Sequence, residues 1–147
     1  MQGVVGGIYA YAQGTGEATA VAIDDQYKPA SIDAESARTL EGALLSITDK
    51  ADTIAGMFAL GLQPTGSRDP FALRRQANGL VKTIADHDLR LPISKVFLQP
   101  SALHHAVARP ETSSHAEFEG SALQAFFRTR FDIYMPQPQG CASHLFT

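Results

Sequence analysis

The sequence predicts an all-α protein built on a central helical hairpin, and three observations support that fold class. Apolar residues recur at three- and four-residue steps in two successive stretches, the spacing that gives an α-helix one buried face. The connector between them, Q-P-T-G-S-R-D-P over residues 63–70, contains residues that end one helix and begin another. The first apolar stripe comprises Leu44, Ile47, Ala51, Ile54, Ala55, Phe58 and Leu62. The second comprises Leu73, Ala77, Leu80, Val81 and Ile84.

The ends of the two hairpin helices are marked by small, polar and cyclic residues. Thr39 is expected to open the first helix, and Gly61 stands where a helix takes a left-handed residue after its last turn. Pro64 then prevents the helix from continuing. Asp69 is expected to be the N-cap of the second helix, with Pro70 at its first position, where the missing N–H costs nothing. The polar side of the first helix is expected to hold Asp49, Lys50, Asp52 and Thr53.

Two shorter helices are predicted before the hairpin. Residues 1–13 contain three glycines, which weaken an isolated helix by about 1 kcal/mol each relative to alanine but suit close packing against another backbone. Thr15 is expected to cap a second helix that runs to about Tyr27, and residues 28–39 are expected to form a loose link. The apolar sides are assigned to Val4, Val5, Ile8, Tyr9 and Ala12 in the first helix, and to Ala18, Val21 and Ala22 in the second.

Two more helices are expected after a break at Leu91–Pro92. The first is assigned Val96, Phe97, Leu103 and Val107, with an interruption at Pro100. The second is capped by Ser113 or Ser114 and holds Phe118, Ala122, Leu123, Phe126, Phe127 and Phe131. Arg128 and Arg130 lie near its end, where cations suit the helix dipole. The proline-containing stretch 136–147 shows no periodicity, and we expect a disordered tail.

Composition bounds the class of protein. With 147 residues, the chain is expected to form one domain. Its formal net charge of −3 argues against a surface that is basic throughout and binds nucleic acid electrostatically, but does not exclude a local basic face. Cys141 is the single cysteine, which excludes an internal disulfide and suits a reducing cytoplasm. No apolar run approaches the roughly 20 residues of a membrane span, and the first residues do not form a secretion signal. We therefore expect a cytoplasmic protein without a membrane partner.

One long motif gives the chain a family resemblance. The run D-K-A-D-T-I-A-G-M-F-A-L-G-L-Q-P-T-G-S-R-D-P-F-A-L-R-R, residues 49–75, resembles the signature of the β subunit of bacterial heterotetrameric glycyl-tRNA synthetase. Matches in order upstream are Gln2–Ala10, Gly16–Glu17 and Val21–Ile23. The resemblance implies an HD-like helical domain over residues 1–135, strongest over 1–90, in a chain that is a truncated part of a much longer subunit.

The same resemblance implies a role within an ATP-dependent glycine–tRNA ligase. In that family the α subunit carries the aminoacylation site, so ATP and Mg would bind there and this chain would bind no cofactor. The β subunit contributes mainly tRNA recognition and assembly. The implied partners are the α subunit, tRNA(Gly) and the rest of the β subunit. Alone, the chain is expected to be catalytically silent, with no catalytic residue.

A metal-dependent HD-type phosphohydrolase is the alternative from another functional class. Such enzymes hold a divalent ion between histidines and aspartates from separate helices, and the ion activates water. Asp49 or Asp52 could supply the last aspartate, but no histidine precedes His87 and no His-Asp pair precedes Asp49. We therefore expect no metal. A purely structural module between other domains is the second alternative.

Other chemical motifs are weaker. His87–Asp88 is expected to lie in a loop or helix cap, and His104 and His105 are adjacent on a helix, where they diverge and cannot chelate together. Residues 61–67 lack the spacing of a phosphate-binding loop. Cys141 has no histidine fixed beside it.

A basic set on or near the second hairpin helix is the candidate functional site. It consists of Arg68, Arg74, Arg75 and Lys82. Guanidinium forks on a rigid element suit tRNA phosphates, which they contact with two parallel hydrogen bonds. The other interpretations are a solvated face with Asp69 and Asp86 as neighbours, or ion pairs with another domain or subunit.

Overall fold

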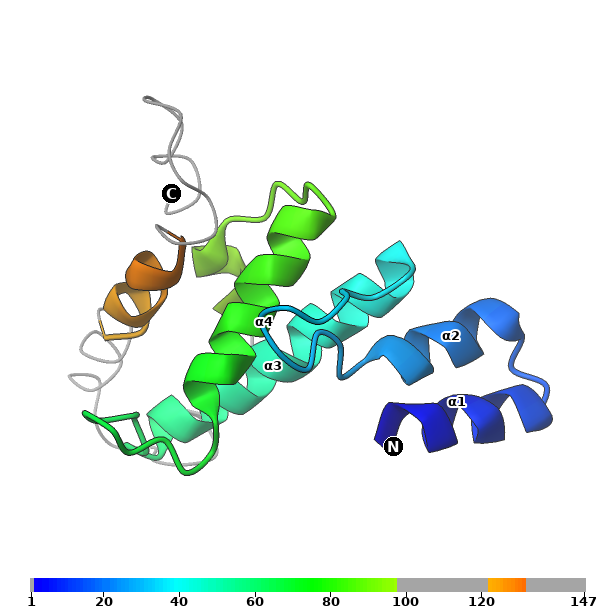
Figure 1. The fold of residues 1–147 in the computed structure, drawn as a ribbon, viewed down its shortest axis with the longest axis horizontal. Coiled ribbons are helices and arrows are strands. Elements are labelled where there is room, and N and C mark those ends of the chain that lie inside the picture. Colours follow the sequence, from blue (N-terminus) through cyan, green and yellow to red (C-terminus); the bar gives the residue numbers. More distant parts are fainter. Residues whose placement is uncertain (1, 98–121, 132–147) are drawn as a thin grey trace.

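The computed structural model describes residues 2–97 and 122–131, and these residues are helical apart from their connections (Figure 1). The helices are α1 (Gln2–Ala12), α2 (Glu17–Asp25), α3 (Leu40–Ala59) and α4 (Leu73–Asp86), followed by helical stretches at 93–97 and 122–131. Within this part of the chain, the only β pairing is an isolated bridge between Thr65 and Arg68. The all-α prediction is confirmed.

The apolar core lies where α3, α4 and the two later helical stretches meet (Figure 1). Ile54, Leu80, Val81 and Ile84 are fully buried, and each such side chain stabilises the fold by about 1.5–3 kcal/mol. Aromatic rings from distant segments complete the cluster. The Phe58 and Phe126 centroids are 5.3 Å apart, and those of Phe97 and Phe127 are 5.0 Å apart. Both predicted stripes of the hairpin are thereby confirmed in their central positions.

The two ends of the first stripe were assigned wrongly. Leu44 and Leu62 are each 44 % exposed. Early in α3 the buried face is formed by the small residues Gly42, Ala43 and Ser46, because this part of the helix faces α2 and the 28–38 connection. Leu62 lies past the helix end, where its N–H bonds to the carbonyl of Met57 and its side chain is partly exposed.

The predicted caps of α3 are confirmed. Thr39 has an extended backbone, and its hydroxyl accepts the Gly42 N–H at 3.1 Å. At the other end Gly61 has φ +72, a left-handed conformation that glycine adopts without a Cβ clash. Its N–H bonds to the Phe58 carbonyl, and the Leu62 N–H bonds to Met57, which together make a Schellman motif.

The predicted start of α4 is wrong by several residues. Residues 69–72 form a turn closed by the Ala72 N–H and the Asp69 carbonyl, and Ala72 takes the left-handed conformation with φ 53. Pro70 therefore lies in the turn and the helix begins at Leu73. Asp69 still caps it from a distance, since its two carboxylate oxygens accept the N–H groups of Leu73 and Arg74 at 2.7 and 2.9 Å.

The α1–α2 hairpin projects from the core, and α1 packs against α2 (Figure 1). Its contact is made by glycine backbone, as the glycine content predicted: a Cβ built on Gly3 would lie 2.3 Å from the Asp24 carbonyl oxygen. Val4, Val5, Ile8 and Tyr9 lie on one side of α1, as predicted, and that side is exposed. The buried face consists instead of Gly3, Gly7 and Ala10, which allow the two backbones to approach closely.

The prediction for α2 is correct in place but not in detail. Gly16 is the N-cap, and the Thr15 hydroxyl donates to the Ala10 carbonyl at 2.9 Å instead of capping. The buried residues are Ala20, Ala22 and Asp25.

The break at Leu91–Pro92 is confirmed. Predictions for Leu103, His104, His105, Val107, Ser113, Ser114, Phe118, Cys141 and the segment 136–147 lie outside the described residues.

Candidate functional site

Two members of the basic set are exposed arginines. Arg68 lies in the connector before α4 and Arg75 lies in its first turns, and both are exposed. Among the residues that the structure describes, neither side chain makes an ion pair with a carboxylate. The bridge between Thr65 and Arg68, with N–O distances of 3.1 and 2.8 Å, fixes the connector that carries Arg68. Both groups are therefore available to an anionic partner.

Arg74 lies near Arg130, an arginine that the sequence did not associate with it. Arg130 stacks on the Phe126 ring, with its guanidinium carbon 3.8 Å from the centroid, and donates to the Phe126 carbonyl. Burial lowers the pKa of Arg130, the positive charge of Arg74 lowers it further, and Asp69 opposes the change. Two like charges are thus close together at the start of α4. The only available signal was the prediction that Arg130 ends a helix, which does not show where that helix packs.

Lys82 differs from the arginines because its charge is already paired. Its ammonium lies 2.8 Å from Asp86, one turn later on α4. The Ser36 hydroxyl donates to the same carboxylate oxygen at 2.6 Å. Burial would raise the pKa of Asp86, but the hydrogen bonds from Lys82 and Ser36 outweigh it and lower the value. The interpretation as a solvated face therefore fits Lys82 better than Arg68 or Arg75.

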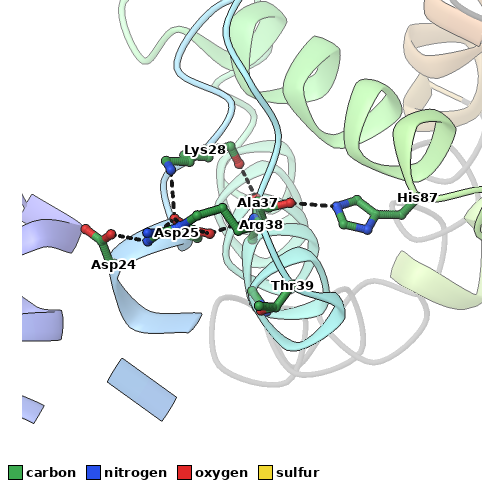
Figure 2. A network of polar contacts seen from close by, with 9 residues as sticks. Asp24, Asp25, Lys28, Ala37, Arg38, Thr39 and His87 are labelled. Carbon is green, nitrogen blue, oxygen red and sulfur yellow. Dashed lines mark hydrogen bonds and ion pairs between the residues drawn. The ribbon is translucent and has the colours of Figure 1, made fainter. Parts of the chain in front are cut away.

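A buried carboxylate joins α2 to the connection before α3 (Figure 2). Asp25 is completely buried, and its oxygens accept from the Arg38 Nε, Nη2 and backbone N–H at 2.6–3.1 Å. Lys28 lies 2.9 Å away on the other side, and Arg38 also pairs with Asp24. Residues 28–39 are therefore not the loose link that was predicted. Arginine and carboxylate geometry match in such a bidentate pair, which fixes direction as well as distance.

The electrostatics of this network are dominated by pairing. Burial alone would raise the pKa of Asp25, but hydrogen bonds from Arg38 and Lys28 hold it at about 2. Hydrogen bonding to Asp25 raises the pKa of Arg38 in turn. On the far side of the loop, the His87 Nε2 lies 2.9 Å from the Ala37 carbonyl (Figure 2). The loop thus connects α2, α3 and the C-terminal end of α4, and His87 is the C-cap of α4 as predicted.

Lys50 is buried, although it was expected on the polar side of its helix. Its ammonium donates to the Ser46 hydroxyl at 2.6 Å and to the carbonyls of Lys28 and Gln26 at 3.0 and 3.4 Å. Burial lowers the pKa of Lys50 to about 8, and the nearby Asp49 opposes that change. Within the described residues the ammonium has neutral oxygen acceptors and no ion pair within 4 Å. The helical period could not show this, because the burying element is the distant loop 26–30.

An open pocket of about 580 Å³ lies beside Lys50. It is bounded by α3, the start of α4 and residues 27–30, and its lining includes Tyr27, Asp49, Lys50, Thr53, Arg75 and Gln76. Asp49 is partly engaged, since its Oδ1 accepts from the Gln26 amide at 3.0 Å. The pocket therefore contains two cations and one carboxylate, and Arg75 belongs both to it and to the basic set.

The residues proposed for a phosphohydrolase metal site do not assemble one in the described part of the chain. Over residues 2–97 and 122–131, no three His, Cys, Asp or Glu side chains are grouped closely enough to hold an ion. Asp49 instead contacts Gln26, and Asp52 is exposed on α3. The positively charged Lys50 lies next to Asp49 in sequence and on the pocket wall. This arrangement favours an anion over a metal cation.

Comparison with known proteins gives consistent matches. Residues 1–146 match the model of the family described as glycyl-tRNA synthetase beta subunit. A glycine–tRNA ligase beta subunit of Acidobacterium capsulatum is 44 % identical over 140 residues, 95 % of this chain and 19 % of the relative. That of Nitratidesulfovibrio vulgaris is 49 % identical over 104 residues, 71 % of this chain and 15 % of the relative. That of Pseudomonas syringae is 46 % identical over 91 residues, 62 % of this chain and 13 % of the relative.

The chain spans less than a fifth of the length of these curated relatives. In the described part of the chain, no helix is both long and apolar enough to cross a membrane.

Proposed function

The chain belongs to the glycyl-tRNA synthetase β-subunit family, and from that premise we propose that it supplies a tRNA-contacting surface to a glycine–tRNA ligase. The observation that supports this most is the pair of exposed, unpaired guanidinium groups of Arg68 and Arg75 in the described chain, held on a fixed connector and the first turns of α4. Half or more of protein–nucleic acid hydrogen bonds go to phosphate and sugar, and arginine is suited to them.

The wider assembly is part of the same proposal. The chain would act in the cytoplasm with the rest of a β subunit, an α subunit that carries the ATP- and Mg-dependent chemistry, and tRNA(Gly). It would not itself be catalytic and would hold no metal. Arg74 would contribute a weaker contact with phosphate because it lies near the positive charge of Arg130. Lys82 would be structural because its charge is paired with Asp86.

The test uses the α/β enzyme whose β subunit contains this chain. Removing one phosphate contact should flatten the plot of log affinity against log salt by roughly 0.7–0.9. Arg68→Ala with Arg75→Ala should therefore weaken tRNA binding and reduce that slope by up to about twice this amount. Lys82→Ala is the matched control, because it removes from the same helix a positive charge that Asp86 already neutralises. Filter binding across a salt series measures both.

Glycine activation separates recognition from chemistry. Pyrophosphate exchange with ATP and glycine, measured without tRNA, should be the same in the double variant as in the parent enzyme. Unchanged tRNA affinity in a correctly folded double variant would instead assign these arginines to the structural alternative, an interdomain module.

A further inference from the structure

The pocket beside Lys50 has a composition that the phosphate-contacting surface does not require. It holds an exposed aromatic ring, Tyr27, the cations of Lys50 and Arg75, and polar side chains from two helices. Its volume of about 580 Å³ lies within the range of small-ligand sites, about 300–1,000 Å³. A surface that only neutralises phosphates needs no such cavity.

The charge of the pocket selects an anionic ligand. Lys50 and Arg75 are opposed by Asp49 alone among the lining residues, and one oxygen of Asp49 already accepts from Gln26. The buried Lys50 ammonium keeps its positive charge near neutral pH, since its pKa is about 8. Arg75 has no carboxylate partner in the described chain, so its guanidinium can donate to a single phosphate group.

The remaining walls suit a flat ring and its polar edge. Tyr27 is 46 % exposed and its ring is available for stacking. Thr53 donates its hydroxyl proton to the Asp49 carbonyl, and the Gln76 amide nitrogen donates to the Phe71 carbonyl. The Thr53 hydroxyl oxygen and the Gln76 Oε1 can therefore still accept hydrogen bonds from a ligand. Unpaired bases are recognised in this way, by an aromatic face and by hydrogen bonds at the base edge.

We propose that this pocket binds one unpaired nucleotide, with its phosphate on Arg75 and its base against Tyr27. The proposal rests on the proposed function to the extent that Arg75 belongs to both sites, so a strand that crosses the start of α4 can place a nucleotide in the pocket. The shared ligand chemistry is a nucleoside monophosphate unit, whether it is part of an RNA or free in solution.

The experiment uses substitutions that spare the basic set. Tyr27→Ala removes the stacking face without opening the core, and Gln76→Glu adds a negative charge to the wall of the pocket. Tyr11→Ala is the matched control, because Tyr11 is an exposed tyrosine on α1, 66 % exposed and outside the pocket. Each variant is made in the α/β enzyme. Filter binding measures tRNA, and calorimetry measures uridine monophosphate, a nucleotide that avoids confusion with an ATP site.

The expected result is that Tyr27→Ala weakens tRNA binding by roughly tenfold, within the range known for base–aromatic stacking. Gln76→Glu should also weaken tRNA binding, because its negative charge repels an anionic ligand. Tyr11→Ala should have no effect. If the two pocket variants weaken uridine monophosphate binding but leave tRNA binding intact, the nucleotide proposal holds and its ligand is a free nucleotide.

If neither ligand responds to Tyr27→Ala or Gln76→Glu, the pocket proposal is overturned. That outcome is distinct from failure of the proposed function, which is measured by Arg68→Ala with Arg75→Ala. A drop in tRNA affinity in that double variant, with no effect of the pocket variants, would leave the surface contact standing without the pocket.

Discussion

The α3–α4 core and the α1–α2 hairpin are both pairs of packed helices, but they are held together differently. The core joins large apolar side chains such as Ile54, Leu80 and Phe127, which are fully buried. The hairpin joins backbones through Gly3 and Gly7 and leaves its large apolar residues exposed. Apolar burial stabilises in proportion to area, whereas glycine contact buries little area. The core should therefore determine stability, and the hairpin should open more readily.

The largest effect is expected from a cavity in the core. Leu80→Ala removes a fully buried side chain and should lower the free energy of unfolding by about 2–5 kcal/mol. Ile8→Ala, at an exposed position of α1, should change it by less than about 0.5 kcal/mol. Urea denaturation followed by circular dichroism measures both. Equal decreases in the two variants would contradict the difference between core and hairpin.

A methyl group between the hairpin backbones should separate the two helices. A Cβ on Gly7 would lie 2.7 Å from the Ala20 carbonyl oxygen, and backbone cannot yield as a side chain can. Gly7→Ala should cost about 1–3 kcal/mol and speed amide exchange in α1 without affecting α4. Gly6→Ala is the matched control, since its Cβ would meet only the Ile23 side chain. If amide exchange in α1 were as slow in Gly7→Ala as in Gly6→Ala, the two helices would not be in close backbone contact.

Alkaline pH should raise the stability of the folded chain, because burial disfavours the charged form of Lys50. The pKa of Lys50 is lowered by burial from 10.5 to about 8, so between these values the unfolded chain binds more protons than the folded chain. Stability should therefore rise as pH increases from about 8 to 10.5, by about 2 kcal/mol after allowance for relaxation. The difference between the parent and Lys50→Met, in urea denaturation across this window, isolates the effect. A pH response that survives in Lys50→Met would belong to other groups.

Acid should lower the free energy of unfolding by a smaller amount, because it weakens the Asp25 network that links the α1–α2 hairpin to the core. The pKa of Asp25 is held at about 2 against 3.8, so its contribution is present above about pH 4 and disappears as pH falls through 2. The decrease should be about 1–2 kcal/mol, allowing for the exposed face of Arg38. Thermal unfolding between pH 4.5 and 2 measures it. Asp88→Asn, at an exposed carboxyl group, should keep the same response, while Asp25→Asn should abolish it.

The same contrast explains which features the sequence could predict. The helical period identified the buried apolar side chains of α4, because large apolar side chains are buried on one face wherever the partner lies. Thr39 and Gly61 were correct because their chemistry fixes local backbone geometry. The period failed for Leu44, which stays exposed because the partner packs against small residues of α3. In α1 the apolar side with Val4 and Val5 is likewise the exposed one, because α2 packs against glycine backbone.

The candidate site could be predicted only in part. Arg68 and Arg75 were identified from composition and motif, and the structure leaves them exposed and unpaired in the described chain. Lys50 and Arg130 were not recognised because their environments come from segments far away in sequence. The start of α4 was misplaced since Pro70 has the same local sequence whether it lies in a turn or at the first helical position.

We propose that tRNA contacts the connector before α4 and α4 itself, and not the α1–α2 hairpin. Hydrogen–deuterium exchange of the α/β enzyme, with and without saturating tRNA, tests this most directly. The account predicts that tRNA slows amide exchange in residues 63–76 and leaves α1 unchanged. Protection confined to α1 and α2, with no change in residues 63–76, would contradict it.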